Sequence, residues 1–104
     1  MSAISNDDEI KKGLIQKLTH ELPVLRVRLG ASQADIAEMI GISRQTYNSI
    51  ETKKREMNWT TFVALIAVFQ NNQETRRMLN SIEGFEREIG NVMSVREQTE
   101  RIKK

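Results

Sequence analysis

Apolar residues near the start of the chain recur at the spacing of one helical stripe. At intervals of three or four residues they read Ile10, Leu14, Leu18, Leu22, Leu25 and Leu29, a period that predicts a helix with one buried face. Pro23 interrupts the stripe, and a proline inside a helix costs about 3 kcal/mol. We therefore expect two helical pieces with a break near residues 21–23, Pro23 falling in the first turn of the second piece.

A short helix is predicted to begin after Ser32. Ser32 and Asp35 have the spacing of a capping box, in which two side chains satisfy N–H groups at the helix start. Gly41 marks the end, because a residue without Cβ readily takes the left-handed conformation that stops a helix. The side chains expected to face inward are Ile36, Ala37 and Ile40.

A second short helix is predicted to follow almost at once, with Ser43 as its cap. The helical period turns Tyr47 and Ile50 toward the core. The outward face then carries Arg44, Gln45, Asn48 and Ser49.

The most apolar stretch of the chain comes after Asn58, which can cap a core helix. Trp59 opens this helix and is expected to pack against it. Its interior positions are Phe62, Leu65, Ile66 and Phe69. The polar run at residues 70–73 marks the following turn.

A further apolar seam occupies the last third of the chain, at Met78, Ile82, Phe85, Ile89 and Val92. Its spacing is that of the a and d positions of a coiled coil, but it lasts only about two heptads. Gly84 and Gly90 lie within it, and each costs about 1 kcal/mol relative to alanine. The seam needs a partner surface, either its own domain or, as we favour, a second copy of the chain. Residues 96–104 are nearly all polar and are expected to fray.

The composition fits one small all-α domain. The chain has 104 residues, one Pro, five Gly and no Cys, so an all-β fold is disfavoured and neither disulfides nor thiolate metal sites are available. Charged residues interrupt the first apolar positions, and no stretch approaches the roughly 18 apolar residues of a membrane span. These features predict a soluble, cytoplasmic protein.

Charge alone says little about a partner, since the net formal charge is +2. Its distribution says more. Residues 22–70 carry six basic and four acidic side chains, and Lys53, Lys54 and Arg55 are consecutive. A local basic cluster beside a helix end is typical of contact with nucleic acid.

Residues 22–70 resemble the XRE family, the Cro and lambda-repressor-like helix-turn-helix regulators. The resemblance is carried by Ser32-Gln33 at the first helix start, Ala37 at the helix contact, Gly41 in the turn, the run Ser43 to Thr46, and Ile50-Glu51. It implies a lambda-repressor-like bundle of about five helices, with a helical extension at residues 1–21 and a C-terminal helix at residues 71–104 that is a possible dimerisation element.

The second helix of such a motif enters the major groove with its N-terminal residues. Arg can bind two acceptors of guanine and Gln can pair with adenine, so Arg44 and Gln45 are our candidates for base readout, with Asn48 and Ser49 further along the groove. By resemblance, the contacts to the DNA backbone would come from Gln33, Ser43, Thr46, Lys53, Lys54 and Arg55. The same resemblance pairs Arg26 with Glu51 as a structural contact.

The sequence departs from the family pattern at two informative positions. Lys53 stands where a helix-ending Gly is usual, so we expect the recognition helix to run longer here. Met57 stands where Pro is frequent, so the loop before Trp59 is expected to differ in shape.

These observations predict a sequence-specific regulator of transcription, a repressor that binds double-stranded DNA as a homodimer and reads the major groove with residues 43–51. An antitoxin with a toxin partner, or a protein-interaction module that uses the C-terminal helix, remains an alternative. No catalytic residue, cofactor or metal site is expected, because His20 is the single His and there is no glycine-rich phosphate loop.

Overall fold

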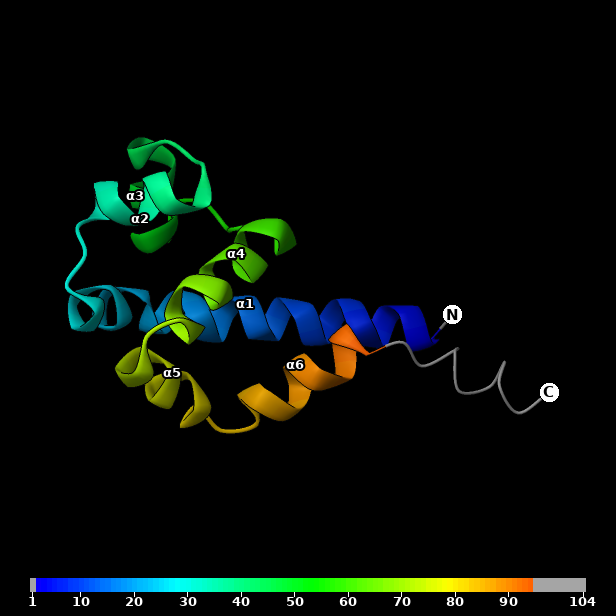
Figure 1. Ribbon diagram of the computed structural model, residues 1–104. Helices are drawn as coiled ribbons and strands as arrows, with labels where there is room; N and C mark the ends of the chain where they lie inside the picture. The colour runs from blue at the N-terminus through cyan, green and yellow to red at the C-terminus, as the bar shows by residue number, and fades with distance from the viewer. Residues whose placement is uncertain (1, 95–104) are drawn as a thin grey trace.

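The computed structural model describes residues 2–94, and over this range the chain folds into six helices without a strand. The helices are α1 (Ser2–Leu29), α2 (Gln33–Ile40), α3 (Arg44–Glu51), α4 (Trp59–Gln70), α5 (Gln73–Asn80) and α6 (Phe85–Met93). Figure 1 shows α1 as the long base, with α2 and α3 together near its C-terminal end and α6 running beside its N-terminal half. The predicted all-α class is confirmed, and the tail at residues 96–104 lies outside the described range.

Helix α1 is continuous, so the predicted break near residues 21–23 is wrong. Pro23 lies inside the helix, with its ring exposed, so the backbone hydrogen bond that it removes is on the solvent side. Leu22 and Leu25 on either side are fully buried, and each such burial contributes about 1.5–3 kcal/mol. Continuing the buried stripe therefore outweighs the cost of one proline.

The capping signals place α2 and α3 as predicted. Ser32 accepts from the N–H of Asp35, whose carboxylate in turn accepts from the N–H of Ser32 at 2.9 Å. Gly41 ends α2 at a φ of 80°, in the left-handed region that disfavours any side chain. Ser43 then caps α3 by accepting from the N–H of Thr46 at 3.0 Å.

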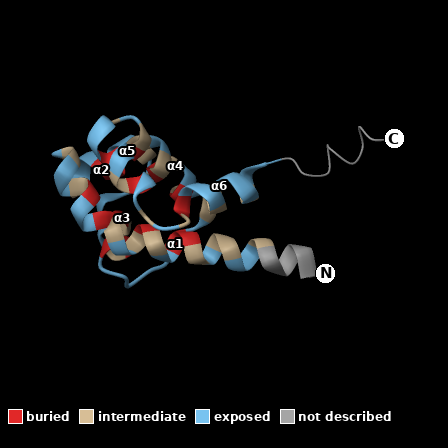
Figure 2. Ribbon diagram, turned by 90° about the horizontal axis from the view of Figure 1, so that it is seen from below, coloured by how far each residue is buried: buried red, intermediate tan, exposed pale blue. Residues whose placement is uncertain are grey.

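The core lies where α1 meets α3, α4, α5 and α6, as the buried segments in Figure 2 show. Asn58 caps α4, and Phe62, Leu65 and Phe69 are buried as predicted, with Ile66 partly buried. From α1 the core receives Leu14, Leu18, Leu22 and Leu25, each 0% exposed. Because these residues span the boundary at residue 21, α1 joins the predicted extension and the first domain helix in one element.

The region predicted as one C-terminal helix is divided into two helices. Asn72 caps α5, and Gly84, at a φ of 74°, separates α5 from α6. Phe85 is 2% exposed, and its ring lies 6.1 Å from that of Phe62. The other seam residues, which pack against the same core, are Met78, Ile82, Ile89 and Val92. Much of the seam is therefore covered by the chain itself.

Candidate DNA-binding interface

The outer face of α3 presents polar side chains at the end of the α2–α3 pair. Arg44, Gln45 and Asn48 are exposed and Ser49 is half-buried. Ala37, 2% exposed, lies on α2, which packs against α3. With eight residues, α3 is about 12 Å long, a suitable size for the major groove, which is about 12 Å wide.

A chain of polar contacts connects the outer face of α3 to α1 and α2. Arg26 on α1 donates through Nε to Oε2 of Glu51 at 3.1 Å, and the Glu51 side chain is only 5% exposed. Gln33 donates through Nε2 to the other oxygen, Oε1, of Glu51. Asn48 donates through Nδ2 to Oε1 of Gln33 at 3.0 Å. The buried ion pair is thereby linked to the exposed surface of α3.

The contact between Arg26 and Glu51 is the structural pair that the resemblance implied. Its extension through Gln33 to Asn48 was not foreseen from the sequence, which placed Gln33 on phosphate and Asn48 on bases. Here the Gln33 amide bridges α2 and α3, with its oxygen and one amide hydrogen engaged inside the protein. Spacing along the chain gives no signal for such a bridge, because it depends on how α2 and α3 cross. The bridge restricts the rotamer of Asn48, so that side chain is preorganised on the surface.

Tyr47 fills the core beneath α3, as its helical phase predicts. It is 0% exposed, and its hydroxyl has no hydrogen-bond partner among the described residues. Burial raises the pKa of Tyr47 well above its usual range, and the neighbouring Glu51 carboxylate raises that pKa further. The phenol is therefore neutral and acts as a packing group.

Because Lys53 stands where the family usually has Gly, we expected α3 to run longer, and this expectation is wrong. The helix ends at Glu51 with Thr52 as cap, and Lys53 takes a left-handed φ of 67°, the only positive φ of a non-glycine residue in the described range. The N–H of Lys53 donates to the carbonyl of Ile50 at 3.0 Å. Lys53 thus ends the helix in the conformation that glycine would adopt, at a cost of about 1–2 kcal/mol.

The basic run after α3 is exposed along its whole length, at Lys53, Lys54 and Arg55. Arg55 folds back toward the start of α3, where its Nη1 lies 3.5 Å from Oγ1 of Thr46. Met57, 3% exposed, anchors the far end of this loop in the core. The loop is therefore held at both ends while its cations face solvent.

Trp59 packs at the start of α4 as expected. Its ring is stacked on Phe62, with centroids 4.6 Å apart and planes inclined by 13°. The Lys11 ammonium lies 5.1 Å from the indole centroid, within the range of a cation–π contact. The start of α4 is thereby tied to α1.

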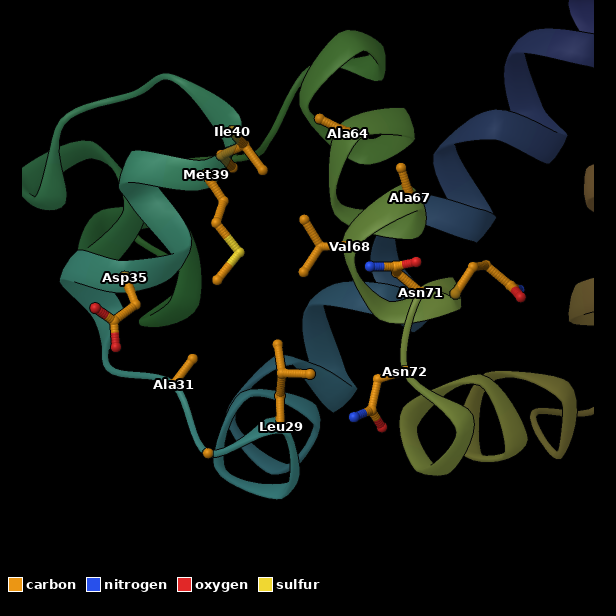
Figure 3. Close-up of a pocket in the computed structure, with 12 residues that line it drawn as sticks. Leu29, Ala31, Asp35, Met39, Ile40, Ala64, Ala67, Val68, Asn71 and Asn72 are labelled. Carbon is orange, nitrogen blue, oxygen red and sulfur yellow. The ribbon is translucent and has the colours of Figure 1, made fainter.

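An open groove of about 880 Å³ lies between α2, α4 and the end of α1. Figure 3 shows Leu29, Met39 and Val68 converging on it. Asp35, which forms the capping box with Ser32, lies at its edge, and the N–H of Ser32 holds the pKa of the Asp35 carboxyl below its usual range. No residue of α3 lines the groove, so this hollow is separate from the face described above.

Residues 2–94 contain no group of three or more His, Asp or Glu side chains that could hold a metal ion. Within this range no helix is both long enough and apolar enough to span a bilayer.

Residues 25–71 match the family model described as Helix-turn-helix. The matched segment runs from the end of α1 to the residue after α4 and contains α2 and α3 in full. The segment at residues 25–71 is a helix-turn-helix domain of the XRE type, and this match supports the role of a DNA-binding helix-turn-helix regulator. No curated protein and no solved structure matches the chain.

Proposed function

We propose that the protein is a sequence-specific repressor of transcription that reads the major groove of double-stranded DNA with α3, as a homodimer. The observation that carries the proposal is the exposed polar face of α3 within a helix-turn-helix domain. This face is fixed in orientation by the Ser43 cap at one end and by the contacts of Asn48, Gln33 and Glu51 near the other.

Base readout is assigned first to Arg44 and Gln45, the two exposed side chains of α3 that have no structural task. Arg44 and Gln45 stand in the first turn of α3, are exposed, and make no hydrogen bond within residues 2–94. Arg presents two parallel donors that match O6 and N7 of guanine, and the Gln amide matches N6 and N7 of adenine. Asn48 and Ser49 lie one turn further on and would contact the next bases.

Backbone contacts are assigned to the polar groups around this face, which set the register of the protein on the duplex. Lys53, Lys54 and Arg55 contribute exposed cations. Ser43 and Thr46 contribute hydroxyls at the start of α3, and Gln33 retains one amide hydrogen. The full set is Gln33, Ser43, Thr46, Lys53, Lys54 and Arg55.

The homodimer is proposed because one α3 spans only a few base pairs, whereas two copies on a two-fold site double the number of base contacts. The predicted contact is the C-terminal helix, α6, where Met93 is 53% exposed and Ile89 and Val92 are partly exposed. Occupancy of a promoter is sufficient for repression, whereas activation needs an additional contact with polymerase. Because the ligand is duplex DNA, we place the protein in the cytoplasm.

The proposal is tested by selecting random duplexes with the purified protein at one stated salt concentration. The variant carries Arg44→Ala and Gln45→Ala. A matched control carries Gln73→Ala and Arg77→Ala, which remove the same two residue types from the exposed surface of α5. All three proteins are first compared by thermal unfolding.

We expect the wild type and the control to enrich one inverted repeat, with half-sites about 10 bp apart from centre to centre. The Arg44 and Gln45 variant should enrich no sequence or a different one. Enrichment of the same repeat by that variant would contradict base readout by α3. Enrichment of a single half-site by the wild type would contradict the homodimer but not base readout by α3.

A further inference from the structure

A second, smaller cavity lies between the middle of α1 and the loop after α3. Its volume is about 380 Å³. The polar groups that line it include Lys12, Gln16 and His20 from α1, and Lys53, Arg55 and Glu56 from the loop. Three permanent cations and one imidazole thus face one carboxylate, and this is the composition of an anion site.

The spacing on α1 explains how one helix supplies half of this lining. Lys12, Gln16 and His20 are four residues apart, so they lie on one helical face. Thr19 also borders the cavity, but its Oγ1 donates to the carbonyl of Ile15 at 2.7 Å. Lys12 and His20 are exposed and remain available to a ligand.

The loop side of the cavity is continuous with the face of α3. Arg55 lines the cavity and also approaches Oγ1 of Thr46, two residues into α3 from its first residue, at 3.5 Å. Lys53 lines the same cavity directly after α3. An anion held there is therefore next to a duplex that has α3 in its major groove.

We propose that this cavity binds a backbone phosphate of the DNA read by α3, with Lys12 as the contributing cation from α1. The inference rests on the proposed DNA-reading function and extends it. Lys12 lies outside the matched family segment at residues 25–71, so the long α1 enlarges the DNA interface beyond the helix-turn-helix domain. His20 and Gln16 contribute N–H donors to the same phosphate.

Acidic side chains near the cavity are expected to oppose the binding of a phosphate. Glu56 lines it, and Asp8 lies one turn before Lys12 on α1. A carboxylate beside a bound phosphate is repulsive, so Glu56 lowers the affinity of this site. Removal of its charge should therefore strengthen DNA binding, which is the opposite of the effect of removing Lys12.

The test measures the dissociation constant for the selected duplex as a function of salt concentration. Loss of one phosphate contact reduces the slope of log K against log salt by about 0.9, and weakens binding about eightfold at about 0.1 M salt. We expect this result for Lys12→Ala, with the selected sequence unchanged. Glu56→Gln should bind more tightly than the wild type.

Arg77→Ala is the matched control, because it removes one positive charge from the exposed surface of α5, away from this cavity and from the proposed dimer contact on α6. It should change the slope much less than Lys12→Ala does. Ethylation of single phosphates locates the contact. Ethylation of one phosphate should weaken the binding of the wild type, and it should weaken the binding of Lys12→Ala less, because one of the contacts to that phosphate is already absent.

The outcomes separate this inference from the proposed function. If the wild type binds its duplex specifically and Lys12→Ala keeps the same slope and the same ethylation pattern, the α1 contact is wrong and base readout by α3 stands. If Arg77→Ala lowers the slope as much as Lys12→Ala does, the effect is one of net charge and the site is also wrong. If the wild type binds no duplex, both the inference and the proposed function fail.

Discussion

At the scale of single residues, Lys53 combines a structural cost with a proposed function. It adopts a φ of 67° at the end of α3, where glycine pays no steric penalty, yet it adds a cation beside the helix that we propose to read the DNA. Positions of this kind, strained for folding but favourable for a ligand, are expected at functional sites.

We predict that Lys53→Gly raises the free energy of unfolding by about 1 kcal/mol while weakening DNA binding several-fold. Chemical denaturation and DNA titration measure the two effects. Lys53→Ala is the control, because it removes the same charge and keeps the strain; it should weaken binding equally without stabilising the fold. Destabilisation by Lys53→Gly would show that the left-handed conformation carries no cost here.

The effect of Tyr47 on stability depends on the burial of its hydroxyl, which has no hydrogen-bond partner among the described residues. A buried hydroxyl without a partner costs about 1–3 kcal/mol, so Tyr47→Phe should leave the protein as stable as the wild type at pH 7, or more stable. The pH dependence has a definite sign. The folded state raises the pKa of Tyr47 above its ordinary value of 10.0, so its contribution to stability is complete below pH 10 and is lost as the pH rises further.

Denaturation of both proteins between about pH 8 and pH 11 tests this prediction. The wild type should lose stability faster than Tyr47→Phe above about pH 10, because its unfolded state releases the phenolic proton first. Parallel curves for the two proteins would contradict a raised pKa.

At the scale of elements, the starts of α2, α3 and α4 were predictable because each is marked by a local cap, whereas α3 was predicted to run past its observed end at Glu51. Ser32, Ser43 and Asn58 all accept hydrogen bonds at the positions that their spacing implies. Two elements were not predictable in this way. Pro23 is tolerated because its ring faces solvent, and the C-terminal seam is divided because Phe85 packs on the core formed by α1 and α4.

The two glycines of the C-terminal region should respond oppositely to alanine. Gly84 has a φ of 74°, and an added Cβ would lie 3.2 Å from Nη2 of Arg87, so Gly84→Ala should destabilise the protein by about 1–2 kcal/mol. Gly90 lies within α6 with nothing within 4 Å of an added Cβ, so Gly90→Ala should stabilise it by about 1 kcal/mol. Thermal unfolding measures both, and effects of the same sign would contradict the division into α5 and α6.

At the scale of the whole molecule, the sequence identified the candidate side chains but not the contacts between distant elements. The bridge formed by Gln33 between Glu51 and Asn48, and the cavity shared by Lys12 and Arg55, depend on how α1, α2 and α3 cross. No period in the chain encodes that geometry. For the same reason, the sequence did not show that much of the apolar seam at residues 78–92 would be covered by α1 of the same chain.

The remaining exposed part of that seam gives a prediction about assembly. Met93→Glu should raise the dissociation constant of the dimer about tenfold or more, because it places a charge at an apolar contact. Met39→Glu is the control, since Met39 is similarly exposed at 58% but lies beside the groove of α2 and α4. Analytical ultracentrifugation measures both. If Met39→Glu dissociates the dimer and Met93→Glu does not, the contact on α6 is wrong and the dimer interface lies at that groove.

The central claim is that α3 reads base sequence, and the specificity ratio tests it most directly. The affinity for the selected duplex is compared with that for a scrambled duplex at one salt concentration, for the wild type and for the Arg44→Ala, Gln45→Ala variant. We predict a ratio of at least about 10³ for the wild type, and a loss of about 10- to 100-fold for each base contact removed. An unchanged ratio in the variant would contradict the claim.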